Sequence, residues 1–209
     1  MKKSHKIALI MLIAALLILE RYAFINLLNF KELFRQGLVN EGLDEDQMAL
    51  SLQMQSWLIP ISIIMKLLSI LFVSGLIYLG CLLFDYGKKF KAIYVVVFLS
   101  ETVFILAKGL NFLVLKSRLS DITNLEYLKK YQVLSAQHFF DYHSVSESVF
   151  SALGTISIFQ ILYCLGLAYG LKLIINKSFM KSFEVILYSY VSVFTLMTLG
   201  KILVGLNFS

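Results

Sequence analysis

Long apolar runs recur from one end of this chain to the other, and they constrain its fold more than any other feature. They cover about residues 57–84, 92–115, 145–175 and 183–206, and a shorter run covers 7–19. A transmembrane helix needs about 20 consecutive apolar residues to cross the hydrocarbon core. Hydrophobic residues make up 59% of the sequence and charged residues only 15%, an apolar excess that one soluble core does not bury. The sequence therefore predicts an all-α, polytopic transmembrane helix bundle forming a single transmembrane domain (1–209).

The first apolar run follows a basic start and resembles a signal peptide. No small-residue cleavage site appears before Glu20–Arg21, and Tyr22 can anchor a helix at the interface. We therefore expect this run to be retained as a span, with its cleavage as the alternative. The chain then has about five spans, at about 7–28, 57–84, 92–115, 156–175 and 183–206.

Amphipathic helices are expected outside the bilayer. Apolar residues recur at helical spacing from Phe30 to Leu38, which indicates a helix lying on the membrane. Asp44, with Gln47 three residues later, has the pattern of a capping box, so a helix should begin there and run into the next span. Pro60 should lie in the first turns of that span, where a missing donor is tolerated.

The apolar stretch 145–175 is too long for one simple span. Gly154–Thr155 divides it, which predicts a short interfacial helix before the break and a span from about residue 156. The polar segment 116–144 precedes this stretch and should lie outside the bilayer.

The net charge of +6 is a matter of membrane topology rather than of nucleic-acid binding, because the lysines cluster at the ends of apolar runs. Cytoplasmic segments of membrane proteins are rich in Lys and Arg near the span ends. One side of this chain has nine such charges over very short segments, namely Lys2, Lys3, Lys6, Lys88, Lys89, Lys91, Lys172, Lys177 and Lys181. The other side has seven over much longer loops, namely Arg21, Lys31, Arg35, Lys116, Arg118, Lys129 and Lys130. This density predicts that the N-terminus lies inside and the C-terminus outside.

Charged residues within spans are costly and are candidates for function. Lys66, Glu101 and Lys108 lie inside the expected second and third spans. Glu101 and Lys108 are seven residues apart and so share a helix face. Either lysine could neutralise Glu101 as an ion pair that fixes helix packing, or the three could form a polar intramembrane site.

No other motif indicates chemistry. The sequence contains no HExxH zinc-protease motif, no P-loop and no GxSxG elbow, so we expect no enzyme activity and no cofactor. His138, Asp141 and His143 are too poorly spaced for a metal site, and none is expected. Gly166 and Gly170 have the small-xxx-small spacing of a helix contact, within the chain or between subunits.

The order of features resembles bacterial members of the Yip family, the Ypt/Rab-interacting multi-span membrane proteins. The resemblance spans about residues 42–206. It rests on the acidic helix start Gly42–Gln47, the turn Tyr86–Lys91, Phe98–Glu101, Leu153–Ile161 and the segment Leu165-Gly166-Leu167-Ala168. Thr155-Ile156-Ser157 stands where the family has an acidic junction.

The resemblance implies a membrane protein without an enzymatic role, probed through its neighbours. We expect an integral membrane scaffold or accessory subunit in a bacterial cytoplasmic membrane. Its partners would be the lipid bilayer and other membrane subunits, or further copies of itself. The alternative is a transporter, or a transporter's membrane subunit, with a polar site around Glu101.

Overall fold

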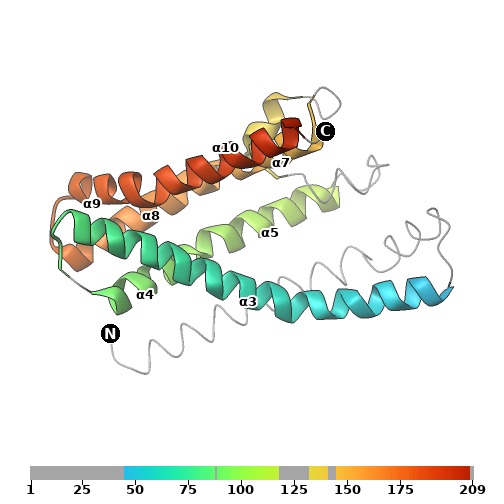
Figure 1. Cartoon of the computed structure of the whole chain (residues 1–209), viewed down its shortest axis with the longest axis horizontal. Coiled ribbons are helices and arrows are strands. Elements are labelled where there is room, and N and C mark those ends of the chain that lie inside the picture. Colours follow the sequence, from blue (N-terminus) through green and yellow to red (C-terminus); the bar gives the residue numbers. More distant parts are fainter. Residues whose placement is uncertain (1–44, 88, 118–131, 141–144, 208–209) are drawn as a thin grey trace. The chain divides into compact units, whose positions relative to one another are not determined.

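The computed structural model of the protein describes residues 45–87, 89–117, 132–140 and 145–207 (Figure 1). The elements in these ranges are helices, and the single extended pairing among them is an isolated bridge between Ser135 and Ser157. In chain order they are α3 (Glu45–Leu83), α4 (Phe90–Ser100), α5 (Thr102–Ser117), η2 (Ala136–Phe139), α7 (Glu147–Thr155), α8 (Ile158–Ile175), α9 (Phe179–Ile186), η3 (Leu187–Val191) and α10 (Ser192–Asn207). The predicted all-α fold is confirmed.

Four helical stretches of the described chain are long and apolar enough to cross a membrane. They are Ile61–Leu83, Phe90–Asn111, Ile158–Ile175 and Phe179–Val204. These four agree with the spans expected from residue 57 onward. The expected first span, 7–28, and the amphipathic helix expected from Phe30 to Leu38 lie outside the described residues.

The longest helix, α3, begins at Glu45, directly after the expected cap Asp44, which itself lies outside the described residues. It runs without a break through Pro60 to Leu83. Pro60 is therefore in the interior of a helix, not in its first turns as expected. The reason is that the extramembrane helix and the span are one element, so the first turn lies near Glu45.

The break predicted at Gly154–Thr155 is present. Helix α7 ends at Thr155 and α8 begins at Ile158, with Ile156 and Ser157 in extended conformation between them. Ser157 caps α8, because its Oγ accepts a hydrogen bond from the backbone N–H of Gln160 at 3.3 Å. At the other end, Asn176 adopts the left-handed conformation (φ 52°) that commonly terminates helices.

The chain divides into two compact units, 1–66 with 108–125 and 67–107 with 126–209. We call the second one the bundle unit, and the rest of the description concerns it. The single transmembrane domain expected from the sequence stays a prediction. Lys66 and Lys108 belong to the first unit, and Glu101 to the bundle unit.

Buried apolar side chains at helical spacing hold the bundle unit together. They are Ile70, Val73, Ile77 and Cys81 of α3, Ile93 and Val97 of α4, Tyr163, Leu167, Ala168 and Leu171 of α8, Val185 and Ile186 of α9, and Tyr190 of η3. Cys81 is a buried free thiol, as expected of a small hydrophobe, and Cys164 is a half-buried one.

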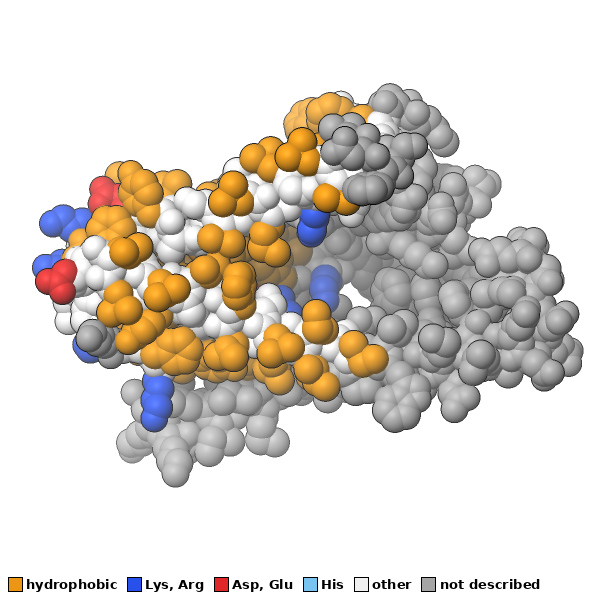
Figure 2. All heavy atoms as spheres, viewed as in Figure 1, with side chains coloured by type: hydrophobic (Ala, Val, Ile, Leu, Met, Phe, Trp, Pro, Cys, Tyr) orange, Lys and Arg blue, Asp and Glu red, His pale blue; other side chains and the backbone are white. Residues whose placement is uncertain are grey.

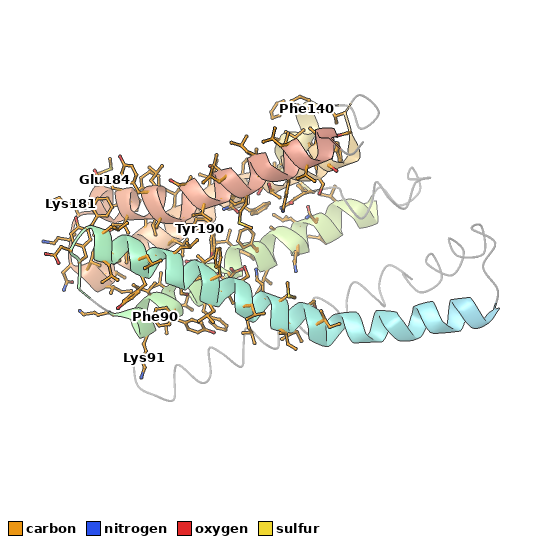
Figure 3. The ribbon with its side chains drawn as sticks, in the orientation of Figure 1. Phe90, Lys91, Phe140, Lys181, Glu184 and Tyr190 are labelled. Carbon is orange, nitrogen blue, oxygen red and sulfur yellow. The ribbon has the colours of Figure 1, made fainter. Side chains whose placement is uncertain are left out.

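The two ends of the bundle unit differ in composition. The turns between α3 and α4 and between α8 and α9 carry Lys89, Lys91, Lys177 and Lys181, and we call this the basic end. Charged side chains gather there in Figure 2, while orange apolar side chains cover the helices beyond it. At the other end η2, α7 and the start of α8 meet, and we call this the cap end. In Figure 3, Lys181 and Glu184 mark the basic end, Phe140 marks the cap end, and Tyr190 lies between them.

Candidate functional site

Glu101 lies at a break in the third span. Helix α4 ends at Ser100 and α5 begins at Thr102, whereas the sequence predicted one uninterrupted helix over 92–115. The Thr102 hydroxyl donates to the Leu99 carbonyl oxygen at 2.8 Å, a local bond that competes with regular helix geometry. The backbone N–H of Phe104 reaches back only three residues, to the Glu101 carbonyl oxygen at 3.0 Å. This tightened turn accounts for the break.

The Glu101 carboxylate is buried in the bundle unit, with 5% of the residue exposed. The Tyr163 hydroxyl of α8 donates a long hydrogen bond to Glu101 Oε1, at 3.3 Å. Ser100 beside it is also buried. A buried carboxylate needs polar partners, and here α8 supplies one of them.

Tyr190 lies on a second backbone irregularity. The segment η3, Leu187–Val191, is π-helical, and the N–H of Ser192 bonds the Leu187 carbonyl oxygen five residues back. Such bulges widen the helix locally and are frequent at functional positions. The Tyr190 hydroxyl accepts a 2.7 Å hydrogen bond from Nε2 of Gln160 on α8.

Aromatic rings connect these two irregularities. The Tyr163 ring lies 4.8 Å from that of Phe104 and 5.6 Å, edge to face, from that of Tyr190, measured between ring centroids. Tyr190 in turn stacks on Phe194 at 6.1 Å. Edge-to-face pairs of this kind favour a fixed arrangement of the rings. Tyr163 is therefore held between α5 and η3, with its hydroxyl at Glu101.

Gly166 and Gly170 face α4 within the bundle unit. A Cβ atom on Gly170 would lie 2.4 Å from Val96 Cγ1, closer than real contacts allow, so only glycine fits there. A Cβ atom on Gly166 would lie 3.5 Å from Ser100 Oγ, which is ordinary contact. Of the two options left open by the sequence, these positions form a contact within the chain.

The other intramembrane candidates, Lys66 and Lys108, are half-buried and exposed, respectively. Because they belong to the other unit, the ion pair expected between either of them and Glu101 stays a prediction. The partner that the structure does bring to Glu101 is Tyr163, which the sequence analysis did not single out.

Gln137 organises the cap end and is 2% exposed. Its Nε2 donates to the Phe150 carbonyl oxygen at 2.9 Å, and its Oε1 accepts from the Gln132 N–H at 2.9 Å. The amide packs so closely on Gly154 that a Cβ atom there would lie 2.6 Å from Nε2. Gln137 thus joins residues 132–140 to the helix break at Gly154.

The backbone bridge between Ser135 and Ser157 holds the same segment in place. The Ala136 N–H donates to the Ile156 carbonyl oxygen at 2.8 Å, and the Ile158 N–H donates to that of Leu134 at 3.0 Å. Together with the Gln137 bonds, these pairs make residues 132–140 a cap over the α7–α8 junction. We call this segment the cap.

The cap presents apolar side chains on its surface. Phe139 is 86% exposed and Phe140 is also exposed. His138 is exposed, and its Nδ1 lies 3.2 Å from the Ser135 carbonyl oxygen. Asp141 and His143 lie outside the described residues, and no group of three His, Cys, Asp or Glu side chains that could hold a metal ion occurs within them.

Comparison of this chain with protein-family models, curated proteins and solved structures gives no match. The resemblance to the Yip family accordingly rests on the short motifs given above.

Proposed function

We propose that this protein is a non-enzymatic integral membrane subunit, a Yip-like scaffold or accessory subunit, and that the cap is its contact with another membrane protein. The observation that carries the proposal is the exposure of Phe139 and Phe140 on a segment that is itself firmly attached to the bundle unit.

Attachment matters because binding energy is lost when a segment must be ordered on binding. Four hydrogen bonds named above, two from the Gln137 side chain and two from the backbone, hold the cap before any partner arrives. Phe139 is therefore presented in a fixed place. Exposed aromatic residues outside the membrane-spanning helices are typical of protein contact sites.

Photo-crosslinking from Phe139 tests the proposal. A photoreactive phenylalanine analogue at position 139 in the full-length protein in its native membrane should give one discrete protein adduct. Leu83, at the basic end, is also 86% exposed and provides the matched control position. A probe at position 83 should label lipid and give no discrete protein adduct. If position 139 labels only lipid, or labels the same proteins as position 83, the proposal is wrong.

The buried Glu101 favours a second candidate function, a transporter or its membrane subunit with a polar site at this residue. Two backbone irregularities, at Glu101 and at Tyr190, meet around Tyr163. Non-helical backbone at membrane depth is tolerated where it is packed within protein or lines a polar path.

Proton flux into vesicles containing the purified full-length chain tests this second candidate. If Glu101 serves transport, Glu101→Gln should abolish the flux and leave the amount of folded protein unchanged. If Glu101→Gln instead removes the folded protein, the carboxylate has a packing role and the transport reading fails.

A further inference from the structure

Polar groups on α8 run from the cap end toward Glu101. Ser157, Gln160 and Tyr163 follow one another at a spacing of three, which places them along one side of the helix. The hydrogen bond from Gln160 reaches Tyr190, and that from Tyr163 reaches Glu101. Gln160 is only half-buried, so this series of polar groups begins near the surface at the cap end.

The opposite direction, from Glu101 to the basic end, is apolar along the seam between α4 and α8. Val97, Leu167 and Ala168 are 0% exposed, and Ile93 and Leu171 are 1% exposed. Val96 fills the space against Gly170. Interiors packed to this extent leave no room for water.

The buried serines in this apolar part do not extend the polar series. The hydroxyls of Ser74, Ser182 and Ser189 donate to carbonyl oxygens four residues back in their own helices. Such bonds satisfy the hydroxyl locally. The polar series therefore connects Glu101 with one end of the bundle unit.

Position along the helices agrees with this asymmetry. Glu101 is eleven residues beyond Phe90, about 16 Å from the basic end at 1.5 Å per residue. Tyr163 is only five residues from the start of α8, about 8 Å from the cap end. The carboxylate is thus nearer to the end from which the polar series begins.

The site has the composition of a proton site. The titratable groups around Glu101 are Tyr163 and Cys164 of α8 and Tyr190 of η3, with Lys108 seven residues further along the chain. A hard cation such as Ca²⁺ takes six to eight oxygen ligands, whereas a proton needs one carboxylate oxygen. Tyr and Gln side chains can both donate and accept hydrogen bonds along the way.

We propose that Glu101 binds a proton that reaches it from the cap end only, through Gln160, Tyr190 and Tyr163, with the apolar part of the α4–α8 seam as the barrier on the other side. The inference does not depend on the partner proposed for the cap, and the crosslinking test above can fail without affecting it.

A lipid-soluble carbodiimide can report the proton on Glu101. The carboxyl proton moves to a carbodiimide nitrogen and the carboxylate oxygen adds to the central carbon. The resulting O-acylisourea rearranges to a stable N-acylurea without a leaving group, so the adduct contains all atoms of both reactants. Only the protonated carboxyl begins this reaction.

The experiment uses the full-length protein in vesicles of one orientation, with impermeant buffers that set the pH on each side separately. Mass spectrometry measures the labelling rate at Glu101 and, as an internal control, at Glu184, which is exposed at the basic end. While Glu101 is mostly ionised, lowering the pH at the cap end by one unit should raise its labelling up to about tenfold. The same change at the basic end should leave Glu101 unaffected and raise the labelling of Glu184.

A paired variant sharpens the result. Tyr190→Phe combined with Gln160→Met should slow the response of Glu101 to the pH at the cap end, while the labelling of Glu184 shows that the protein is still folded. The proposal is overturned if Glu101 follows the pH at the basic end, at both ends or at neither. A response to both ends would favour the transporter.

Discussion

The two parts of the bundle unit on either side of Glu101 are built differently. Toward the basic end, α4 and α8 meet through Val96, Val97, Gly170 and Leu171, and the seam is apolar and close-packed. Toward the cap end, hydrogen bonds of Gln160, Tyr163 and Gln137 take over. Helices in lipid associate by close packing of small residues, because the surrounding tails are as apolar as the side chains. The apolar part therefore accounts for the association of the helices, and the polar part for their specific arrangement.

The largest effect is expected from Leu167→Ala in the apolar part. Leu167 is fully buried, so its truncation leaves a cavity and should destabilise the fold by about 2–5 kcal/mol. Thermal unfolding in nanodiscs, followed by circular dichroism, measures the change. Leu165→Ala on the same helix is the control, because Leu165 is exposed and should have little effect. Equal losses from both variants would contradict the packing described for this seam.

A smaller loss, about 1–3 kcal/mol, is expected from Gly170→Ala, which forces a methyl group against Val96. Adding Val96→Ala should restore most of the stability, because it removes the side chain that the new methyl group meets. The same unfolding assay applies. Gly75→Ala is the control, since no atom lies within 4 Å of a Cβ atom at that position. If Val96→Ala does not rescue, the close contact is not the cause of the loss.

Gln137→Leu should act on the cap and leave the apolar part intact. It removes the partners of the Phe150 carbonyl and the Gln132 N–H, and each unsatisfied group costs about 1–3 kcal/mol. Hydrogen exchange should accelerate at the amides of Ala136 and Ile158, which bond across the junction. The amides of Leu167 and Leu171 should keep their protection, and faster exchange there would show that the two parts are not separate.

The smallest effect, about 1 kcal/mol, is expected from Tyr163→Phe, which removes one long hydrogen bond to Glu101 and keeps the ring. Tyr169→Phe is the matched control, because Tyr169 is exposed on the same helix. A difference of several kcal/mol between the two variants would mean that Glu101 depends on Tyr163 far more than a single hydrogen bond implies.

Much of the framework could be predicted from the sequence, because hydropathy and helix punctuation are local signals. The apolar runs give the described spans, and Gly154–Thr155 marks the break before α8. Gly166 and Gly170 have the spacing of a close helix contact, and the structure places α4 against them.

The interruptions of the third and last spans could not be predicted in the same way. Ser100-Glu101-Thr102 contains neither Pro nor Gly, and the π-helical segment Leu187–Val191 has no composition of its own. Both depend on hydrogen bonds and packing between helices, which a single sequence does not display. The one available signal was the spacing of Ser157, Gln160 and Tyr163, which places polar groups on one side of an otherwise apolar helix.

Gln137 was missed for a different reason. It lies in a polar segment where a glutamine is unremarkable in sequence, and its burial follows only from the return of the chain over Gly154.

The antiparallel alignment of α4 and α8 has a consequence for how the two helices choose their relative position. Val96 faces Gly170, and a slide of α8 by four residues, about one helical turn, would bring Gly166 to Val96 with a similarly good fit. In that second alignment Glu101 would face Phe159, which has no hydroxyl to offer, in place of Tyr163. The glycines alone allow two alignments, and the buried carboxylate selects one of them. Glu101 thus acts as an index pin for the bundle, a role in which buried polar groups are well attested.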